Sequence, residues 1–246
     1  MAPQWWSSQL DPARHAQPVR ATGVLASRAF RGRSRNGRPT IAPGKDTMLN
    51  PELLQLLRGL MEQARASGDP EATAMTLATV GSDGRPHARV VLLKSIETDG
   101  PQFYTNYRSA KGEEIRAHAE VALCLHWKHL GEVRAGGVQV RIEGRASRLH
   151  DDESDAYFAT RPRGSQIGAW ASLQSQTLPD RSAFDARVAE YEQQFADQEV
   201  PRPPHWGGYR VLADMIEVWR GREFRLHERR RWERFADVWR ERLLYP

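Results

Sequence analysis

The sequence predicts a mainly β domain of the α+β class, an antiparallel β-barrel with helices packed on its outside. Short apolar runs follow one another along the chain, and two of the turns between them contain the pairs Asp83-Gly84 and Asp99-Gly100. An Asp-Gly pair between apolar runs is a strong signal for a β-hairpin. Because few helical stretches separate the runs, consecutive hairpins and hence an antiparallel barrel are favoured.

The first expected element is an amphipathic helix over residues 51–67, whose leucines recur at helical spacing. Asn50 can cap this helix, Pro51 fits its first turn, and Gly68-Asp-Pro70 ends it. Alternating or apolar runs and their flanking turns then predict the remaining elements in order. These are strands over 74–80, 88–93 and 102–105, a helix over 109–117, a strand over 121–127, a loop over 131–137, a strand over 139–149, helices over 151–160 and 179–195, a proline-rich connector over 201–204, and three strands within 208–245.

The charge of the chain is concentrated near its N-terminus. Of the formal net charge of +5, residues 1–47 contribute +6 from eight basic and two acidic residues, so the remainder carries −1. A near-neutral body argues against nucleic-acid binding, which requires a basic face. The sequence has no apolar run long enough to span a membrane. Its one cysteine, Cys124, allows no internal disulfide and no cysteine metal cluster, so no metal site is predicted and the cytoplasm is the expected location.

Residues 1–47 show no periodicity and are expected to form a disordered basic extension before a single domain over 48–246. Three explanations remain open for the extension: a targeting peptide, a basic arm for nucleic acid or membrane, or a leader upstream of a true start at Met48. The third is favoured because Met48 directly precedes a well-formed helix beginning.

The segment from Arg161 to Ser175 carries the chemistry of an anion site. Arg161-Pro-Arg163 places two cations around a proline, and Ser165, Gln166 and Gln174 add hydroxyl and amide groups. Guanidinium and hydroxyl donors with little acidic charge nearby suit a phosphoryl group. An arginine-capped surface helix is the competing interpretation.

Two further segments carry similar chemistry. Arg89-Val-Val-Leu-Leu-Lys94 places a cation at each end of an apolar run that predicts a buried strand, although a lysine at a strand end is often simply solvated. Ser109-Ala-Lys111 lies at a predicted helix start, where backbone N–H groups and a lysine form a natural phosphate site.

Taken together, these segments resemble the pyridoxine (pyridoxamine) 5′-phosphate oxidase family, which are FMN enzymes of the split-barrel fold. The resemblance covers about residues 49–246. It rests on six motifs in family order: Arg89–Lys94, Phe103-Tyr-Thr-Asn106, Tyr157–Trp170, Gln174-Ser175, His205-Trp-Gly-Gly208, and Trp219–His227 with Arg229.

The resemblance implies an FMN-binding split β-barrel with two linings. The cofactor side would comprise Arg89, Val90, Leu92, Lys94, Tyr104, Thr105, Lys111, Gln139, Gln174, Ser175, Trp219 and Arg229. The substrate side would comprise Lys94, Tyr157, Arg161 and Ser165 around a pyridine phosphate, with Arg225 and His227 over the ring as the catalytic pair. Tyr157 precedes Arg161 by four residues, which predicts one face of a helix. Judged singly, Gln139 could be solvated, Trp219 could belong to the core, and His227 could be an ordinary surface residue.

Two features depart from the family pattern. Ala110 stands where the family usually has an arginine before the lysine of the helix-start motif, so one phosphate contact is absent or comes from another residue such as Arg108. The loop 131–137 is also longer than usual, which alters the approach to the flavin.

The resemblance implies a homodimer that oxidises pyridoxamine or pyridoxine 5′-phosphate to pyridoxal 5′-phosphate, with O₂ as acceptor and H₂O₂ as by-product. The site would lie at the dimer interface, with no nucleic-acid or membrane partner. Two alternatives stay open: a related flavin oxidase acting on another ring, such as a phenazine precursor, and a non-catalytic FMN- or pyridoxal-phosphate-binding protein. The presence of Arg225 and His227 argues against the second.

Overall fold

The computed structural model describes residues 48–131, 136–236 and 238–246. Within them lies an antiparallel nine-stranded sheet with helices around it, so the predicted class of mainly β with peripheral helices is confirmed. The expected N-terminal extension and most of the loop 131–137 lie outside the described residues.

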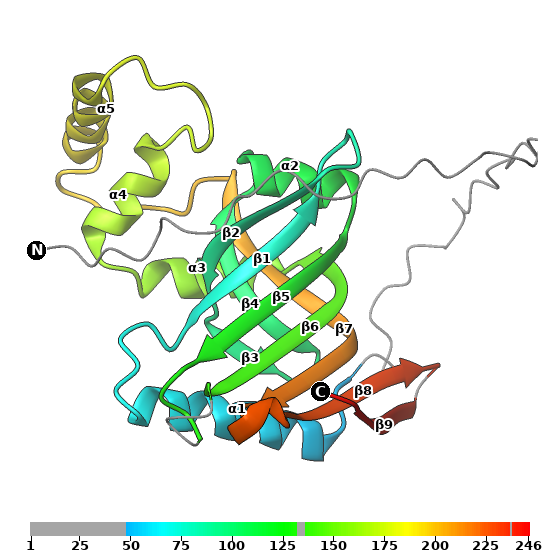
Figure 1. Cartoon of the computed structure of the whole chain (residues 1–246). Helices are drawn as coiled ribbons and strands as arrows, with labels where there is room; N and C mark the ends of the chain where they lie inside the picture. Colours follow the sequence, from blue (N-terminus) through cyan, green and yellow to red (C-terminus); the bar gives the residue numbers. More distant parts are fainter. Residues whose placement is uncertain (1–47, 132–135, 237) are drawn as a thin grey trace, which may run out of the picture. The chain divides into compact units, whose positions relative to one another are not determined.

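The sheet is built almost entirely from neighbouring antiparallel strands (Figure 1). Its order is β2-β1-β5-β6-β7-β4-β3, with β8 paired to β7 and β9 paired to β8. The strands span Ala74–Val80 (β1), Pro86–Leu92 (β2), Ser95–Glu97 (β3), Gly100–Asn106 (β4), Glu120–Trp127 (β5), Val138–Arg148 (β6), Trp206–Arg220 (β7), Glu228–Phe235 (β8) and Val238–Leu244 (β9).

The long strand β7 organises the sheet, because it pairs with β6 along most of its length, with β4 near its start and with β8 toward its end. A β-bulge at Glu143/Gly144 shifts the register of β6 against β7. Gly144 is required there, since a Cβ would lie 2.2 Å from the carbonyl oxygen of Leu212.

Helix α1 (Pro51–Ala66) begins as the sequence predicts. The Asn50 side chain accepts a hydrogen bond of 2.7 Å from the Leu53 N–H, and Pro51 occupies the first turn. Its buried residues Leu53, Leu57 and Leu60 join the main apolar core formed with the inner faces of the strands. Burial of each leucine removes it from water, which stabilises the fold by roughly 2 kcal/mol per side chain.

The described residues contain four further α-helices: α2 (Ala110–Ala117), α3 (Asp151–Ala159), α4 (Arg163–Ala171) and α5 (Arg181–Gln194). Helices α2 and α3 pack on strands of the sheet, whereas α5 packs on α4, away from the strands (Figure 1). A second apolar cluster joins α3 and α4 to the start of β7 through Phe158, Ile167 and Trp206. This cluster fixes the segment that carries Arg161 against the sheet.

The structure corrects the prediction in two places: the short strand β3 was not predicted, and β2 is an edge strand rather than a buried one. As a result Val90 and Leu92 are 64% and 41% exposed in the single chain. Helix α4 lies in the segment 161–175, for which a helix was the competing interpretation. The three predicted C-terminal strands are confirmed as β7, β8 and β9.

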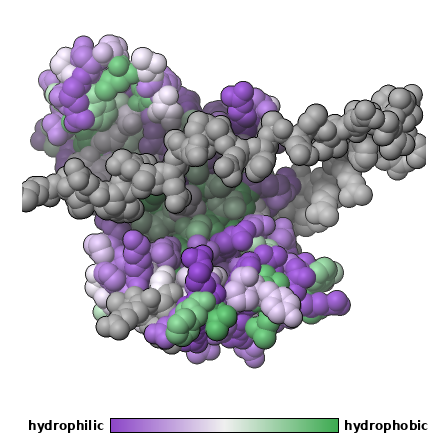
Figure 2. All heavy atoms as spheres, viewed as in Figure 1, coloured by the Kyte–Doolittle hydropathy of each residue, from purple (hydrophilic) through white to green (hydrophobic). Residues whose placement is uncertain are grey.

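Further exposed apolar side chains gather on the C-terminal hairpin and the turn before it: Phe224, Leu226, Phe235, Val238, Leu243 and Tyr245. The view in Figure 2 shows a mostly hydrophilic face with apolar residues in small groups in its lower part. No helix among the described residues has the length and apolar character needed to cross a bilayer.

Candidate functional site

A cavity of about 510 Å³ brings together ten of the residues predicted from the sequence. It is bounded by β2, β4, the start of α2 and the segment from α3 to α4. We call the predicted residues that line it the pocket group: Val90, Leu92, Lys94, Tyr104, Thr105, Lys111, Tyr157, Arg161, Ser165 and Gln174.

One wall of the cavity is a stack of aromatic rings. The ring centroids of Tyr104 and Tyr157 lie 3.9 Å apart, and Trp206 stacks on Tyr104 at 5.5 Å. Burial raises the pKa of Tyr104 to about 12, so its hydroxyl keeps its proton at neutral pH. The stack forms a flat, rigid wall, which suits an aromatic ligand.

Arg161 lies against this wall with its guanidinium only partly satisfied. Its Cζ lies 4.5 Å from the Trp206 ring centroid, a cation–π contact. Its Nη1 is buried and has no hydrogen-bond partner among the described residues. Burial lowers the pKa of Arg161 from its usual value, which expresses the cost of keeping this charge away from water. A buried guanidinium nitrogen without an acceptor is a strong indication of an anionic ligand.

The position of Arg161 overturns one expectation. Helix α3 ends at Ala159, so Arg161 lies beyond it and does not share a helix face with Tyr157. Both side chains nevertheless line the cavity.

Lys111 lines the cavity beside the start of α2. Its Nζ donates hydrogen bonds of 2.9 Å to Ser109 Oγ and 2.7 Å to Gln174 Oε1. Ser109 also caps α2, so the lysine lies beside the unpaired N–H groups of a helix start. Burial, and then the charge of Arg89, lower the pKa of Lys111 to about 8.

Arg89 does not line the cavity in the single chain. Its Nη2 donates a hydrogen bond of 2.8 Å to Glu114, and its Nη1 contacts Thr79. Glu114 also lies 2.5 Å from His87 Nδ1. The pKa of Glu114 is held below its usual value, because hydrogen bonds from Thr79, His87 and Arg89 outweigh the opposing effect of burial. Arg89 therefore lies near Lys111 and is held by a carboxylate.

Five other predicted residues lie on β6, β7 and β8 or in the turn before β8. We call Gln139, Trp219, Arg225, His227 and Arg229 the sheet-end group. Gln139 on β6 and Arg229 on β8 are the direct cross-strand partners of Trp219 on β7, so the three form one row on one face.

The two predicted catalytic residues flank this row. The His227 ring lies 4.5 Å from the Trp219 ring, and His227 Nδ1 accepts a hydrogen bond of 3.3 Å from the Arg222 N–H. Arg225 lies in a short 3₁₀ turn, Glu223–Arg225, with a left-handed backbone φ of 62°. Such a conformation costs about 1 kcal/mol or more in a non-glycine residue, which is typical of functional turns.

The pocket group and the sheet-end group do not meet within one chain. Trp206, at the cavity, and Trp219 are thirteen residues apart on the single strand β7. At about 3.3 Å per residue that is roughly 40 Å of extended strand, far more than one small ligand can span. Figure 1 shows the same separation, with β8 and β9 at the opposite end of β7 from α4.

Sequence reasoning assigned no role to three residues that the structure makes prominent. Trp206 walls the cavity, and Glu114 and Glu217 hold the predicted cofactor arginines Arg89 and Arg229. Trp206 lies in the His205-Trp-Gly-Gly208 motif, which was a usable signal. Ser175 does not line the cavity, but follows Gln174 with a φ of 75°.

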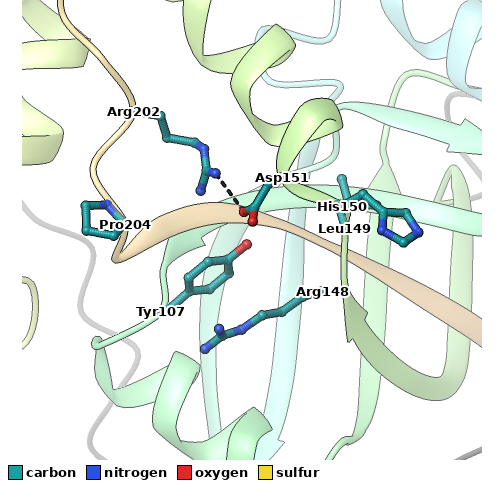
Figure 3. Close-up of a pocket in the computed structure, with 7 residues that line it drawn as sticks. All are labelled: Tyr107, Arg148, Leu149, His150, Asp151, Arg202 and Pro204. Atoms are coloured by element: carbon teal, nitrogen blue, oxygen red, sulfur yellow. Dashed lines mark hydrogen bonds and ion pairs between the residues drawn. The ribbon is translucent and has the colours of Figure 1, made fainter.

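A second cavity, of about 440 Å³, contains none of the predicted residues (Figure 3). Arg202 in its wall is paired with Asp151 at 2.7 Å, and the guanidinium of Arg148 lies 3.9 Å from the Tyr107 ring centroid. Its charges are thus mixed and largely compensated, unlike those of the first cavity.

Two family models match the chain. The chain matches the pyridoxamine 5′-phosphate oxidase family over residues 61–195 and the pyridoxine 5′-phosphate oxidase C-terminal dimerisation region over residues 206–246. The pyridoxine/pyridoxamine 5′-phosphate oxidase of Myxococcus xanthus is 52% identical over 199 residues, covering 81% of this chain and 94% of that protein. The protein of the same name from Xanthomonas euvesicatoria pv. vesicatoria is 52% identical over 201 residues, covering 81% and 100%.

Two solved structures are similar in fold. PhzG from Burkholderia lata 383, in complex with tetrahydrophenazine-1-carboxylic acid, has a TM-score of 0.73 and 32% identity, covering 85% of this chain and 100% of that one. An FMN-binding, pyridoxamine 5′-phosphate oxidase-related protein from Nostoc punctiforme has a TM-score of 0.62 at 17% identity, covering 80% and 99%, and so supports the fold alone. With a family match over more than half its length and relatives at 52% identity, the chain belongs to the pyridoxine/pyridoxamine 5′-phosphate oxidase family.

Proposed function

We propose that this chain is an FMN-dependent oxidase that converts pyridoxamine 5′-phosphate and pyridoxine 5′-phosphate to pyridoxal 5′-phosphate, with O₂ as acceptor. The amine substrate consumes O₂ and water and releases ammonia and H₂O₂, whereas the alcohol consumes O₂ and releases H₂O₂. We also propose a cytoplasmic location, because the sequence has a single cysteine, Cys124, and so cannot form an internal disulfide.

The observation that carries the proposal is the buried Nη1 of Arg161, which has no hydrogen-bond partner among residues 48–131, 136–236 and 238–246. Tyr157 and Ser165 line the same cavity and add hydroxyl donors, and Lys94 adds a second cation. Guanidinium, ammonium and hydroxyl groups converging beside an aromatic wall suit a phosphorylated ring. The 5′-phosphate of the substrate is the group that we assign to Arg161.

The donors around Lys111 fit the phosphate of FMN. The pKa of Lys111 is lowered by burial and by the nearby charge of Arg89, so two cations are held close together at some electrostatic cost. A phosphate bound between them and the start of α2 would offset that cost. We therefore assign Lys111 and Arg89 to the cofactor phosphate, with Thr105 and Gln174 beside them.

We infer that a complete site needs two copies of the chain. The pocket group and the sheet-end group are too far apart within one chain, and the match to a dimerisation region over residues 206–246 supports a homodimer. In this arrangement the sheet-end group of one copy completes the cavity of the other. The exposed apolar residues Val90 and Leu92 would then be covered.

Bound FMN would supply the two-electron acceptor that takes a hydride equivalent from the C4′ carbon and passes the electrons to O₂. The protein's part is to bind and orient. His227 accepts a backbone N–H at Nδ1, so in its neutral form Nε2 carries the proton and can donate to the substrate's oxygen or nitrogen. Arg225, held by its left-handed turn, would fix the substrate on the same side.

The test is aerobic turnover of pyridoxamine 5′-phosphate by the FMN-loaded full chain, read as aldehyde and peroxide formation. We expect both products in equal amounts, and poor reaction of unphosphorylated pyridoxamine because it cannot contact Arg161. A flavin-loaded chain that forms neither product would reject the proposal and favour a non-catalytic binding protein.

The likeness to PhzG supports one alternative, oxidation of a phenazine precursor. The lower identity, 32% against 52%, favours the phosphorylated substrate, as does Arg161 Nη1, which is buried and has no hydrogen-bond partner in the described part of the chain. Turnover of a reduced phenazine carboxylate but not of pyridoxamine 5′-phosphate would reverse this choice.

A further inference from the structure

Glu217 is a buried carboxylate shared by two arginines. It lies on β7, is 2% exposed, and each of its oxygens accepts from one guanidinium. Oε1 lies 2.9 Å from both Nε and Nη2 of Arg229, and Oε2 lies 3.0 and 2.7 Å from Nε and Nη2 of Arg231. The Glu217 carboxylate thus holds the guanidinium groups of two β8 residues, Arg229 and Arg231.

The strand register places this carboxylate directly beside the sheet-end group. Gln139, Trp219 and Arg229 form one row across β6, β7 and β8, strands that neighbour one another in Figure 1. Two residues along, on the same face, Glu217 is the cross-strand partner of Arg141 and of Arg231. Glu217 therefore reaches diagonally from its own row to the arginine of the row assigned to the cofactor.

These contacts orient the Arg229 guanidinium but occupy only some of its N–H donors. A guanidinium has five N–H donors. Arg229 donates one hydrogen bond from Nε to Glu217 and one from Nη1 to the backbone oxygen of Tyr245 at 3.2 Å, and its Nη2 forms an ion pair with Glu217 at 2.9 Å. Among the described residues the other N–H donors of Nη1 and Nη2 have no further acceptor, and the contacts already made set their directions.

Charge explains why the carboxylate is ionised at this place. Burial alone raises the pKa of Glu217, but the hydrogen bonds from Arg229 and Arg231 outweigh it, so the net pKa lies below the usual value. Arg141 adds a third cation, with its Nη1 3.9 Å from Oε2. A buried carboxylate is strongly destabilising unless cationic groups lie next to it, and the same contacts hold those cationic groups in place.

We propose that Glu217 is a positioning residue, which fixes the Arg229 guanidinium so that its free N–H donors face the flavin. The proposal rests on the proposed function, since it takes Arg229 as a cofactor contact. An arginine that is oriented before binding loses less side-chain freedom when the ligand arrives, and affinity gains accordingly. Arg231 serves this role indirectly by satisfying the second carboxylate oxygen.

The test is a double-mutant cycle on FMN affinity, measured by quenching of FMN fluorescence on titration with flavin-free full-length chain. Glu217→Gln keeps the side chain's shape and is expected to weaken FMN binding about ten-fold. In an Arg229→Met background the same substitution is expected to change the dissociation constant less than about two-fold, because the residue that it positions is gone.

Two further variants separate position from charge and from general damage. Glu217→Asp keeps the charge but withdraws the carboxylate by one methylene group. It is therefore expected to weaken FMN binding in the chain that has Arg229 and not in the Arg229→Met chain. This variant also tests the proposal if Glu217→Gln fails to fold. Glu241→Gln is the matched control, since Glu241 also accepts from an arginine of β8, Arg230 at 2.8 Å, away from the row. Its FMN affinity should equal that of the wild type.

The outcomes are distinct. Weakening that is equally large with and without Arg229 would overturn the proposal and leave Glu217 a purely structural residue of the hairpin. Unchanged or tighter FMN binding in both Glu217 variants would overturn it as well. If Arg229→Met alone has no effect on FMN affinity, the positioning proposal fails at its premise, and turnover of pyridoxamine 5′-phosphate by the wild-type chain shows whether the proposed function stands without it.

Discussion

Lys111 Nζ lies 2.7 Å from Gln174 Oε1, although the two residues are 63 positions apart in the chain. Thr105 Oγ1 lies 3.4 Å from the same amide oxygen. A single acceptor thus joins the start of α2, the end of β4 and the segment after α4. Because this acceptor is neutral, the ammonium charge of Lys111 is left for an anion.

The lowered pKa of Lys111 predicts a pH-dependent affinity for FMN. The lysine is charged below about pH 8 and neutral above it, and only the charged form attracts the phosphate. FMN affinity of the flavin-free chain should therefore hold steady up to about pH 8 and fall above it, by up to about ten-fold per pH unit. Lys111→Arg stays charged throughout and should abolish the fall between pH 7 and 9.5. Titration of both proteins with FMN across this range checks it, and an identical slope in the variant would assign the titration to another group.

Ala110→Arg should tighten FMN binding by about 1 kcal/mol, the net contribution of one added hydrogen bond. Ala110 is exposed at the first position of α2, next to Lys111, so an arginine there can reach a phosphate at the helix start. Ala117→Arg, at the exposed far end of the same helix, adds the same charge away from that point and is the matched control. Equal effects of the two variants, or none from Ala110→Arg, would indicate that Arg108 already fills the place.

The sequence alone was sufficient for elements whose signals are local. Asn50 and Pro51 marked the start of α1, and the Asp-Gly pairs marked turns between strands. Helix α4 was predicted only as a competing interpretation, because it is short and contains Gly164 and Gly168, which lower helix propensity. Its nine residues are held by packing of Ile167 in the second apolar cluster, which no local pattern reveals.

The site was predictable in its members but not in its arrangement. Motif resemblance named both the pocket group and the sheet-end group, yet their separation along β7 depends on strand register, which the sequence does not display. In the sequence, Glu217 resembles an ordinary solvent-facing residue of a strand with alternating polar and apolar positions. Its position between Ile216 and Val218 was nevertheless a signal, because a carboxylate buried in an apolar strand requires cationic partners.

A chain beginning at Met48 should fold, bind FMN and turn over nearly as the full chain does. The described core begins at Leu49, which is 5% exposed, and residues 1–47 have few apolar groups with which to repay an ordering cost. Thermal unfolding and FMN titration of the two chains compare them directly. A large loss of flavin affinity or of turnover in the shorter chain would mean that residues 1–47 contribute to the site.

Arg161→Ala should damage substrate binding and spare the flavin. A hydrogen bond from a charged donor to phosphate contributes about 1.5–3 kcal/mol, which corresponds to roughly ten- to a hundred-fold in apparent affinity. We expect the loss mainly in KM, because the phosphate is remote from the reacting carbon and is held alike in the ground and transition states.

The same substitution has an internal control, because unphosphorylated pyridoxamine never contacts Arg161 and its slow reaction should be unaffected. Steady-state kinetics with both substrates, together with FMN content and the flavin absorption spectrum, separate the two linings of the cavity. If the variant loses FMN while its KM for pyridoxamine 5′-phosphate is unchanged, the unpartnered Nη1 of Arg161 belongs to the cofactor. The substrate phosphate would then have to lie elsewhere, for example beside Lys94, another cation that lines the cavity.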